Sequence, residues 1–467
     1  MGSSASQSCS PKDLASAVHL ELLKRGSSPP AIEVLVELFD SMYFASLKTE
    51  ESRPVLFHIA YVDPDKPDPN PPKTLVHDRW SCVPLHPRIP LSSGKFLKIA
   101  PASDPRTSSF AVYHDTIGGL SVWGLIDQGN RYHDYVNFDS ETGPERPGLF
   151  QASVTGIGHL EAYIGYEKVA ELKHNVLVRS AIDVFKSGSI RTALDIGVQS
   201  HLESLQAGWP DEFSSAMGDL WQPSVVSNWL AALRRLLLRV QGIRHGGAFL
   251  LTSDLSYKGL LVKHSLAYNR LRTALQRQAV ANAQQIEAGS TISAEYMDQD
   301  MDDMPVGLYL DEVVAGYDLE EIRNELGGII WFISLLTRVD GLVLLNQNLE
   351  VQGFGVEITE SDEPGLIYAA GDAYASDWLL RRVDYQHYGT RHRSMMRYCA
   401  KYPGSVGFVI SQDGDVRVMT NVDEKLVIWE NIQLRLPKFV RRKRRKRRIN
   451  RMRKRPRQGP ISEPSNP

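Results

Sequence analysis

The stretch GTRHRS at residues 389–394 places Arg391, His392 and Arg393 side by side. The apolar spacing that follows predicts a helix with Thr390 as its N-cap residue. Positive side chains in the first turn oppose the helix dipole, so they cost stability unless an anion is bound. Free backbone N–H groups and two guanidinium groups converging on one phosphate would remove that cost. The alternative left open is an exposed basic turn paired with nearby Asp or Glu side chains.

A second candidate group is the aspartate of DGLVLLN, at residues 340–346, which stands between an apolar helical pattern and an apolar strand pattern. Burying a carboxylate is costly unless it is paired or bound to a metal ion. Asp340 is therefore a candidate ligand for Mg²⁺ or Mn²⁺ beside a phosphate, since these ions use few protein ligands and take the rest from substrate oxygens. The competing interpretation is a turn, because Asp-Gly is a common turn sequence.

Together, the two motifs resemble the diadenylate cyclase (DAC) domain family, in which a DGA motif begins one strand and a GTRHR motif opens a helix. The intervening LEVQGFGVEI, at residues 349–358, resembles the family's next strand. GSVGFVISQDGDVRV, at residues 404–418, resembles the strand and turn that follow the helix. The resemblance covers roughly residues 319–422.

DAC domains condense two ATP molecules into cyclic di-AMP and pyrophosphate in a face-to-face homodimer. The resemblance implies that Asp340 binds the metal ion and that Gly341 lets the backbone approach the nucleotide. It implies that the helix start holds the phosphates and offsets charge in the transition state. The residues concerned there are Gly389, Thr390, Arg391, His392 and Arg393. Ser411 matches a serine near the nucleotide, and Leu342 stands where the family has a small alanine beside the adenosine.

Two departures from the family pattern divide the functional hypotheses. Leu342 is larger than the family's alanine, and Gln412 replaces a carboxylate that helps with the metal ion. They favour a sensor that binds ATP or an adenine dinucleotide without catalysis. The intact Asp340, Arg391 and Arg393 favour the alternative, an active diadenylate cyclase that uses Mg or Mn.

The pattern along the chain predicts an α/β protein, with a DAC-like mixed β-sheet flanked by helices and a β-rich N-terminal domain. The first half also resembles the arrangement of the group labelled DACNV, whose members are described as nucleotide sensors built around a DAC-like domain. We predict a disordered N-terminus at 1–11, a β-rich sensor domain with a helical start at 12–180, a helical connector at 181–214, a nucleotide-binding domain at 215–435 and a basic disordered tail at 436–467.

Composition restricts the class and location of the protein. Three cysteines without metal or disulfide spacing indicate a reducing compartment, and we expect a cytoplasmic protein without a secretory signal or transmembrane segment. Residues 438–457 hold 14 of the 53 Lys and Arg residues and no acidic residue, although the whole chain carries a net charge of −2. Such a run suits nucleic acid or an anionic membrane. The alternative is a tail that folds back on the acidic body.

Overall fold

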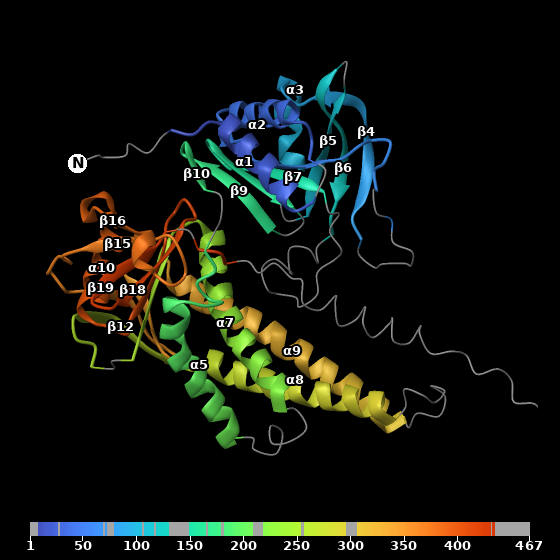
Figure 1. Ribbon diagram of the computed structural model, residues 1–467. Helices are drawn as coiled ribbons and strands as arrows, with labels where there is room; N and C mark the ends of the chain where they lie inside the picture. Colours follow the sequence, from blue (N-terminus) through green and yellow to red (C-terminus); the bar gives the residue numbers. More distant parts are fainter. Residues whose placement is uncertain are drawn as a thin grey trace, which may run out of the picture.

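The computed structural model describes residues 8–26, 29–68, 71, 79–104, 107–115, 118–129, 149–164, 167–178, 182–208, 218–253, 256–295, 306–430 and 432–434. Two units follow one another along the chain, each built around its own large sheet (Figure 1). This architecture confirms the predicted α/β class. The predicted basic tail lies outside the described residues, as do residues 1–7 of the predicted disordered N-terminus.

An eight-stranded sheet forms the N-terminal unit, in the order β10-β9-β8-β7-β3-β5-β6-β4. Its strands are β3 (Phe57–Tyr61), β4 (Ser81–Pro90), β5 (Ser108–Asp115), β6 (Gly119–Asp127), β7 (Phe150–Gly156), β8 (His159–Ile164), β9 (Glu167–Lys173) and β10 (Val176–Val178). Neighbours pair antiparallel except β3 with β5. A separate small ladder joins β1 (Thr49–Glu50) to β2 (Arg53–Pro54).

Two helices cover one face of this sheet, α1 (Pro11–Lys24) and α2 (Ile32–Ser46). A capping box starts α1, in which the Ser10 N–H donates to Asp13 Oδ2 at 2.7 Å. Pro11 occupies the first turn, where a helix accepts proline. Apolar side chains recur at helical spacing in both helices and pack against the sheet in a single core, to which the short α3 (Gly94–Ile99) adds Phe96. The N-terminal unit therefore has a core of its own.

The C-terminal unit is built on a nine-stranded sheet in the order β12-β14-β13-β11-β17-β18-β19-β15-β16. Its strands are β11 (Gly247–Thr252), β12 (Leu260–Tyr268), β13 (Leu342–Asn346), β14 (Val351–Ile358), β15 (Ile367–Ala370), β16 (Leu380–Val383), β17 (Val406–Ile410), β18 (Val416–Val422) and β19 (Lys425–Trp429). Two hairpins contribute to this sheet, as β13 pairs antiparallel with β14 and β17 with β18.

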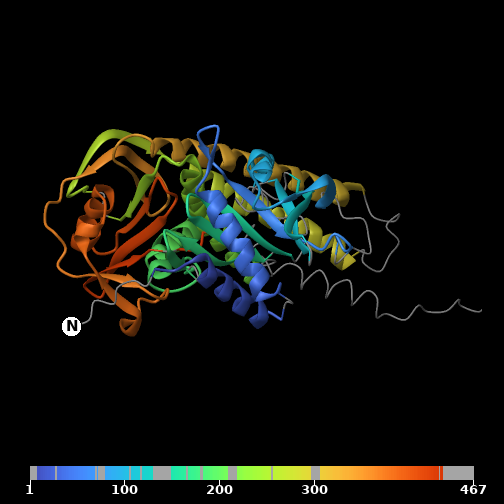
Figure 2. The same ribbon diagram turned by 90° about the horizontal axis from the view of Figure 1, so that it is seen from above.

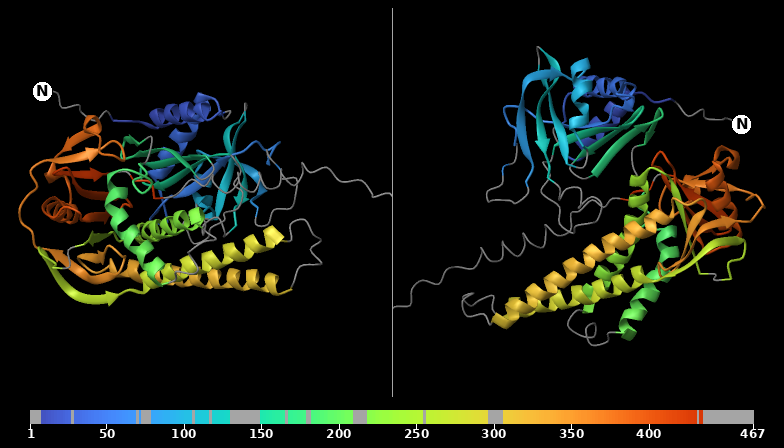
Figure 3. Two further views of the ribbon diagram at one scale, coloured as in Figure 1. Left: turned by 60° about the horizontal axis from the view of Figure 1, so that its bottom comes forward. Right: turned by 180° about the vertical axis from the view of Figure 1, so that it is seen from behind.

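Helices cover both faces of this sheet. On one face lie α5 (Ser189–Gly208), α7 (Gly218–Ile243), α8 (Arg270–Glu295) and α9 (Val306–Leu336), and on the other lies α10 (Thr390–Lys401). Figure 2 shows orange α10 and green α5 and α7 on opposite sides of the strands. Figure 3 shows α8 and α9 extending together beyond the sheet as a long pair. No helix in the part of the chain that the structure describes is long and apolar enough to span a membrane.

The strand sequences explain why both faces are covered. Along β11, Phe249 and Leu251 join the core under α5, α7, α8 and α9, whereas Ala248 and Leu250 join the core under α10. Leu344 of β13 likewise faces α10, as the two-residue period of a strand requires. Continuous apolar runs such as GGAFLLT are typical of strands buried on both faces.

A buried ion pair ties the start of the C-terminal unit to its helical layer. Arg234 of α7 is 3% exposed, and its Nη2 donates to Asp183 Oδ1 at 2.6 Å. The guanidinium also lies over the Phe185 ring at 4.7 Å. The region 181–214 was predicted as a connector, and α5 within it contributes Leu194 and Val198 to this core.

We predict that Asp183→Ala lowers the free energy of unfolding by about 3–5 kcal/mol, because it removes the carboxylate that balances the buried Arg234 charge and leaves the guanidinium with a 3.5 Å contact to the Leu434 carbonyl. Urea unfolding followed by circular dichroism measures the loss. The matched control is Asp195→Ala, which removes an exposed partner of Arg191 in α5 and is expected to cost about 0.5 kcal/mol or less. Equal losses in the two variants would contradict the importance of the buried pair.

Candidate functional site

The register of the C-terminal sheet brings the two sequence motifs to one end of its strands. β11 runs parallel to β13, with Phe249 opposite Val343. β17 runs antiparallel to β11, with Ile410 opposite Gly247. The starts of β11 and β13 and the end of β17 therefore lie at the same end of the sheet, which we call the motif end. The start of β18 lies there too, because β18 pairs antiparallel with β17.

The two motifs meet at this end. Asp340 and Gly341 directly precede β13, and Ser411 directly follows β17. Arg391 Nη1 lies 3.0 Å from the position that a Cβ on Gly246 would take, and Gly246 directly precedes β11. The structure therefore places Asp340 and Arg391 at the same end of the sheet.

A close contact with β17 fixes the position of α10. A Cβ on Gly407 of β17 would overlap the side chain of Met395 in α10 and come within 3.0 Å of Cys399 Sγ. The glycine thus allows the helix to lie close to the sheet, with Met395, Met396 and Cys399 buried beneath it. Cys399 is a core residue, and its burial raises the pKa of its thiol to about 12.

The start of α10 differs from the sequence prediction by one residue. The helix begins at Thr390 and its N-cap is Gly389, so the prediction of Thr390 as the N-cap was wrong. The Arg393 N–H donates to the Gly389 carbonyl at 3.0 Å, which makes Gly389 the first acceptor of the helix. Glycine has no side-chain oxygen, so no side chain caps the helix, and its first N–H groups keep their capacity to bind an anion.

The two arginines of the motif contact different neighbours. Arg393 donates to Gln386 Oε1 at 3.1 Å and lies over the Tyr385 ring at 5.8 Å. Arg391 extends toward Gly246 and, among the described residues, its guanidinium makes no hydrogen bond or ion pair. Residues two apart on a helix do not face one another. The structure therefore does not direct both guanidinium groups to one point, and Arg391 is the one left without a partner.

His392 is 8% exposed and makes a specific contact inside the site. Arg417 Nη1 lies 3.0 Å from His392 Nε2, and since arginine can only donate, the imidazole nitrogen accepts. Burial, followed by the charges of Arg417 and Arg391, lowers the pKa of His392 to about 4. His392 is therefore neutral near pH 7, and it holds Arg417 rather than adding charge for a phosphate.

Arg417 is a site residue that the sequence reasoning missed. It lies on β18, where the neighbouring Met419 faces α10 and Val418 faces the opposite core. Strand alternation therefore puts Arg417 on the α10 face, a signal that was readable in VRVMT. Arg417 also lies over the Tyr388 ring at 5.7 Å. The Tyr388 hydroxyl donates to Glu430 Oε1 at 2.8 Å, and burial together with Glu430 raises the pKa of Tyr388.

The residues around Asp340 serve different purposes. Asp340 is exposed and makes no hydrogen bond or ion pair with a described residue. Gly341 has φ +116°, and a Cβ there would lie 2.5 Å from the backbone carbon of Gly355, so the packing of β13 on β14 requires glycine. Leu342 is 5% exposed and fills the core between the sheet and α10. Of the three, Asp340 is the side chain open to a ligand.

The turn between β17 and β18 is held in place by short hydrogen bonds. Ser411 Oγ accepts from the Asp415 N–H at 3.0 Å, and the Ser411 carbonyl accepts from the Gly414 N–H at 3.1 Å. Gln241 of α7 donates to the Gly414 carbonyl at 2.7 Å. Gln412 is exposed. The Ser411 hydroxyl thus shapes the turn at the motif end.

A single exposed carboxylate fits a metal ion that takes its other ligands from a phosphate, so Asp340 fits Mg²⁺ or Mn²⁺ in that role. Among the described residues, one group of three metal-ligand side chains lies elsewhere, on β8 and β9: His159, Glu161 and Glu171. The ammonium group of Lys168 binds both of these carboxylates, so the cluster already contains its own cation.

Comparison with known protein families identifies one part of the chain. Residues 25–127 match the family described as Probable sensor domain DACNV. The match spans α2 and the strands from β1 to β6, and it confirms the predicted DACNV-type sensor domain. No curated protein matches the chain.

We predict that His392 makes the protein less stable as pH falls. The pKa of His392 is lowered to about 4 in the folded protein and lies near about 6.5 in the unfolded chain, so its stabilising contribution is complete above pH 6.5 and is lost as pH falls toward 4. Between about pH 7.5 and about pH 5, urea unfolding should show a loss of about 2 kcal/mol from this residue.

His392→Gln is the control for this loss, because its amide oxygen can accept from Arg417 and does not titrate. His201, whose pKa burial also lowers to about 4, is present in both proteins and cancels in the comparison. A pH dependence that is the same in His392→Gln as in the wild-type protein would refute the prediction.

Proposed function

We propose that the C-terminal unit binds ATP or an adenine dinucleotide at the motif end, and that the protein is a sensor of nucleotide state. The observation that carries this proposal is the guanidinium of Arg391, which has no partner among the described residues and lies in the first turn of an uncapped helix. A cation in that position opposes the helix dipole, and a bound phosphate removes the conflict.

Phosphate recognition in this proposal uses both backbone and side chains. The first N–H groups of α10 and the guanidinium of Arg391 bind phosphate oxygens, while His392 holds Arg417 close by. The space around Gly389 is open to a phosphate, because no atom outside the adjoining residues lies within 4 Å of the position that a Cβ on Gly389 would take. Its φ of −65° suits any residue, so the backbone conformation does not require a glycine there. The choice of an adenine nucleotide rests on the resemblance of both motifs to the DAC domain family.

Asp340 would hold Mg²⁺ or Mn²⁺ in this complex, at the same end of the sheet as Arg391. The ion would neutralise phosphate charge and, in the alternative function as a cyclase, lower the barrier to deprotonating a ribose hydroxyl. The chain itself supplies the carboxylate, and the exposure of Asp340 leaves it accessible to an ion brought in with the nucleotide.

The alternative function is an active diadenylate cyclase, in which two copies of the chain bring two ATP molecules face to face. Asp340 and Arg391 are both present and both at the motif end, which favours it. Leu342 fills the core beneath α10, and Gln412 offers no carboxylate, which favours binding without catalysis. The sensor family matched at residues 25–127 supports a role in detection for the whole chain.

We predict that Arg391→Ala lowers the affinity for ATP with Mg²⁺ about ten- to a hundredfold, because charge-assisted hydrogen bonds to phosphate contribute about 1.5–3 kcal/mol. Isothermal titration calorimetry measures the affinity. Arg397→Ala is the matched control: it removes the same charge from the same helix, from a residue whose Nη2 contacts Ser394 at 3.1 Å. Equal effects of the two substitutions would refute the site.

The same samples decide between sensor and enzyme. Incubation with ATP and Mg²⁺ or Mn²⁺ is followed by mass spectrometry for a cyclic dinucleotide, with Asp340→Asn as the second variant. A product that disappears in both Arg391→Ala and Asp340→Asn would establish the cyclase and overturn the preferred function. ATP binding without product is the result expected for the sensor, and the absence of both would refute either function.

The basic run at residues 438–457 lies outside the described residues, and its role is a separate proposal: binding of nucleic acid through phosphate contacts. We predict that deleting residues 441–467 weakens binding of double-stranded DNA and flattens the dependence of affinity on salt between about 50 and 200 mM. Fluorescence anisotropy measures both. An unchanged affinity would exclude the tail from nucleic-acid binding, and loss of binding to anionic vesicles alone would assign it to a membrane.

A further inference from the structure

The two units of the protein contact one another beside the motif end. Lys173, the last residue of β9 in the N-terminal unit, donates to Asp415 Oδ1 at 2.5 Å. Asp415 belongs to the turn between β17 and β18 in the C-terminal unit. The Lys173 side chain is 12% exposed and that of Asp415 is 36% exposed, so the pair is half-buried and solvent screens it less than a fully exposed ion pair. A second contact joins Arg244 Nη2 to the Thr155 carbonyl at 3.4 Å.

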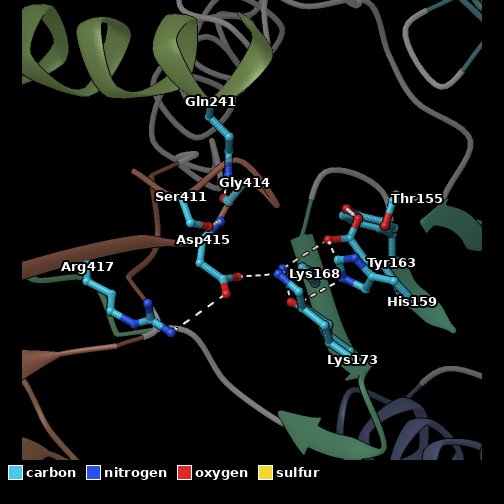
Figure 4. A network of polar contacts seen from close by, with 12 residues as sticks. Thr155, His159, Tyr163, Lys168, Lys173, Gln241, Ser411, Gly414, Asp415 and Arg417 are labelled. Carbon is cyan, nitrogen blue, oxygen red and sulfur yellow. Dashed lines mark hydrogen bonds and ion pairs between the residues drawn. The ribbon is translucent and has the colours of Figure 1, made fainter. Parts of the chain in front are cut away.

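The ion pair continues through consecutive contacts to His392 at the start of α10, and Figure 4 shows the part of this chain that runs from Lys173 through Asp415 to Arg417. Asp415 Oδ2 lies 3.8 Å from Arg417 Nη2, and Arg417 Nη1 donates to His392 Nε2 at 3.0 Å. Figure 4 shows Asp415 between Lys173 on one side and Arg417 on the other. A residue of the N-terminal unit is thus separated from the first turn of α10 by two side chains.

On the other side, the β9–β10 turn is bound to the helices of the N-terminal unit. Asn175 lies in that turn, and its Oδ1 accepts a hydrogen bond of 3.3 Å from the Tyr43 hydroxyl of α2. The Asn175 carbonyl accepts a second hydrogen bond, of 2.8 Å, from the Cys9 N–H. Tyr43 lies within the residues matched to the sensor family. A displacement of α2 would therefore move the turn that directly follows Lys173.

We propose that Lys173 is a positioning residue through which the sensor domain controls the nucleotide site of the C-terminal unit. The Asp415 carboxylate is shared between Lys173 and Arg417, and Arg417 is shared between Asp415 and His392. While Lys173 holds Asp415, Arg417 stays bound to His392. When Lys173 withdraws, the carboxylate turns to Arg417 and competes with His392 for the guanidinium. This inference rests on the proposed function and adds the regulation of that site.

Two features make the proposed switch a local one. The turn that carries Asp415 is held by Ser411 and by Gln241 of α7, so it does not follow Lys173 when the N-terminal unit moves. Arg417 Nε is buried and has no hydrogen-bond partner among the described residues, so it is available to the carboxylate. A small displacement of β9 is therefore sufficient to exchange the partners of Arg417.

Lys173→Met in the full-length protein tests the proposal with two measurements. The first is the pKa of His392 by NMR, without nucleotide. The groups that surround this imidazole are Arg417, Arg391, Asp415 and the Tyr388 ring. Burial and the Arg417 charge lower the pKa of His392 in the wild-type protein to about 4. Loss of the Lys173 charge lets Asp415 offset more of the Arg417 charge, so this pKa is expected to rise.

The second measurement is the affinity for ATP with Mg²⁺ by calorimetry. Lys173→Met is expected to weaken it about three- to tenfold, because one positive charge is removed and Arg417 is drawn away from the site. Lys173→Arg should restore both readouts, since it keeps the charge. The matched control is Lys425→Met, which breaks an exposed ion pair of 2.7 Å between Lys425 and Asp377. Lys425 pairs with Val422, at the opposite end of β18 from Asp415, so this substitution should change neither the pKa of His392 nor the affinity for ATP.

The outcomes separate this inference from the function on which it rests. Wild-type protein that binds no nucleotide refutes the proposed function, and the pKa of His392 in Lys173→Met still tests the coupling. An unchanged pKa overturns the inference whether or not nucleotide binds. If the wild-type protein binds ATP and Lys173→Met binds it with equal affinity, the inference is overturned as well. A double-mutant cycle with Asp415→Asn should show non-additive effects if both residues act through one pair.

Discussion

The parallel pairing of β11 with β13 is the constraint on which the candidate site depends. Parallel neighbours start at the same end of a sheet. The flanking strands β14 and β17 run antiparallel to them, so β14 and β17 end where β11 and β13 start. Side chains alternate between faces, so Leu344 faces the core under α10 and Leu345 faces the opposite core. Gly341 has no room for a Cβ against the backbone of Gly355, so a slip of one residue would bring a side chain into that contact. The observed register places Asp340 and Ser411 at the same end.

Two glycines of the motifs illustrate how structural and functional requirements separate. Gly341 has a positive φ and no room for a Cβ against the backbone of Gly355, so the sheet alone explains it. Gly389 has an ordinary φ and open space around it, so the fold does not explain it. Gly389 is therefore the more informative of the two glycines about a ligand, because the fold does not explain it and it stands at the start of an uncapped helix.

Local patterns in the sequence were sufficient to predict the elements but not the contacts between them. The apolar run of GGAFLLT is typical of a buried strand, and the turns in QN and QDGD favour the two hairpins of the structure, since turn chemistry and alternation are local properties. The N-cap was misplaced by one residue because Gly and Thr are both accepted at helix starts. The charge of His392 was not predictable, because its burial and its contact with Arg417 depend on tertiary packing.

The contact between Lys173 and Asp415 joins residues that are far apart in the sequence, and the QDGD turn that holds Asp415 gives no sign of a partner in β9. Its physical consequence follows from competition for hydrogen bonds. A neutral imidazole is a weaker partner for a guanidinium than a carboxylate is, so the proposed coupling has Arg417 stay with His392 while Lys173 occupies Asp415. Burial is the main cause of the lowered pKa of His392, and Arg417 and Asp415, which stand between it and Lys173, act on that pKa in opposite directions. In the proposed coupling, the sensor domain alters the start of α10, the proposed phosphate site, without deforming the sheet that carries it.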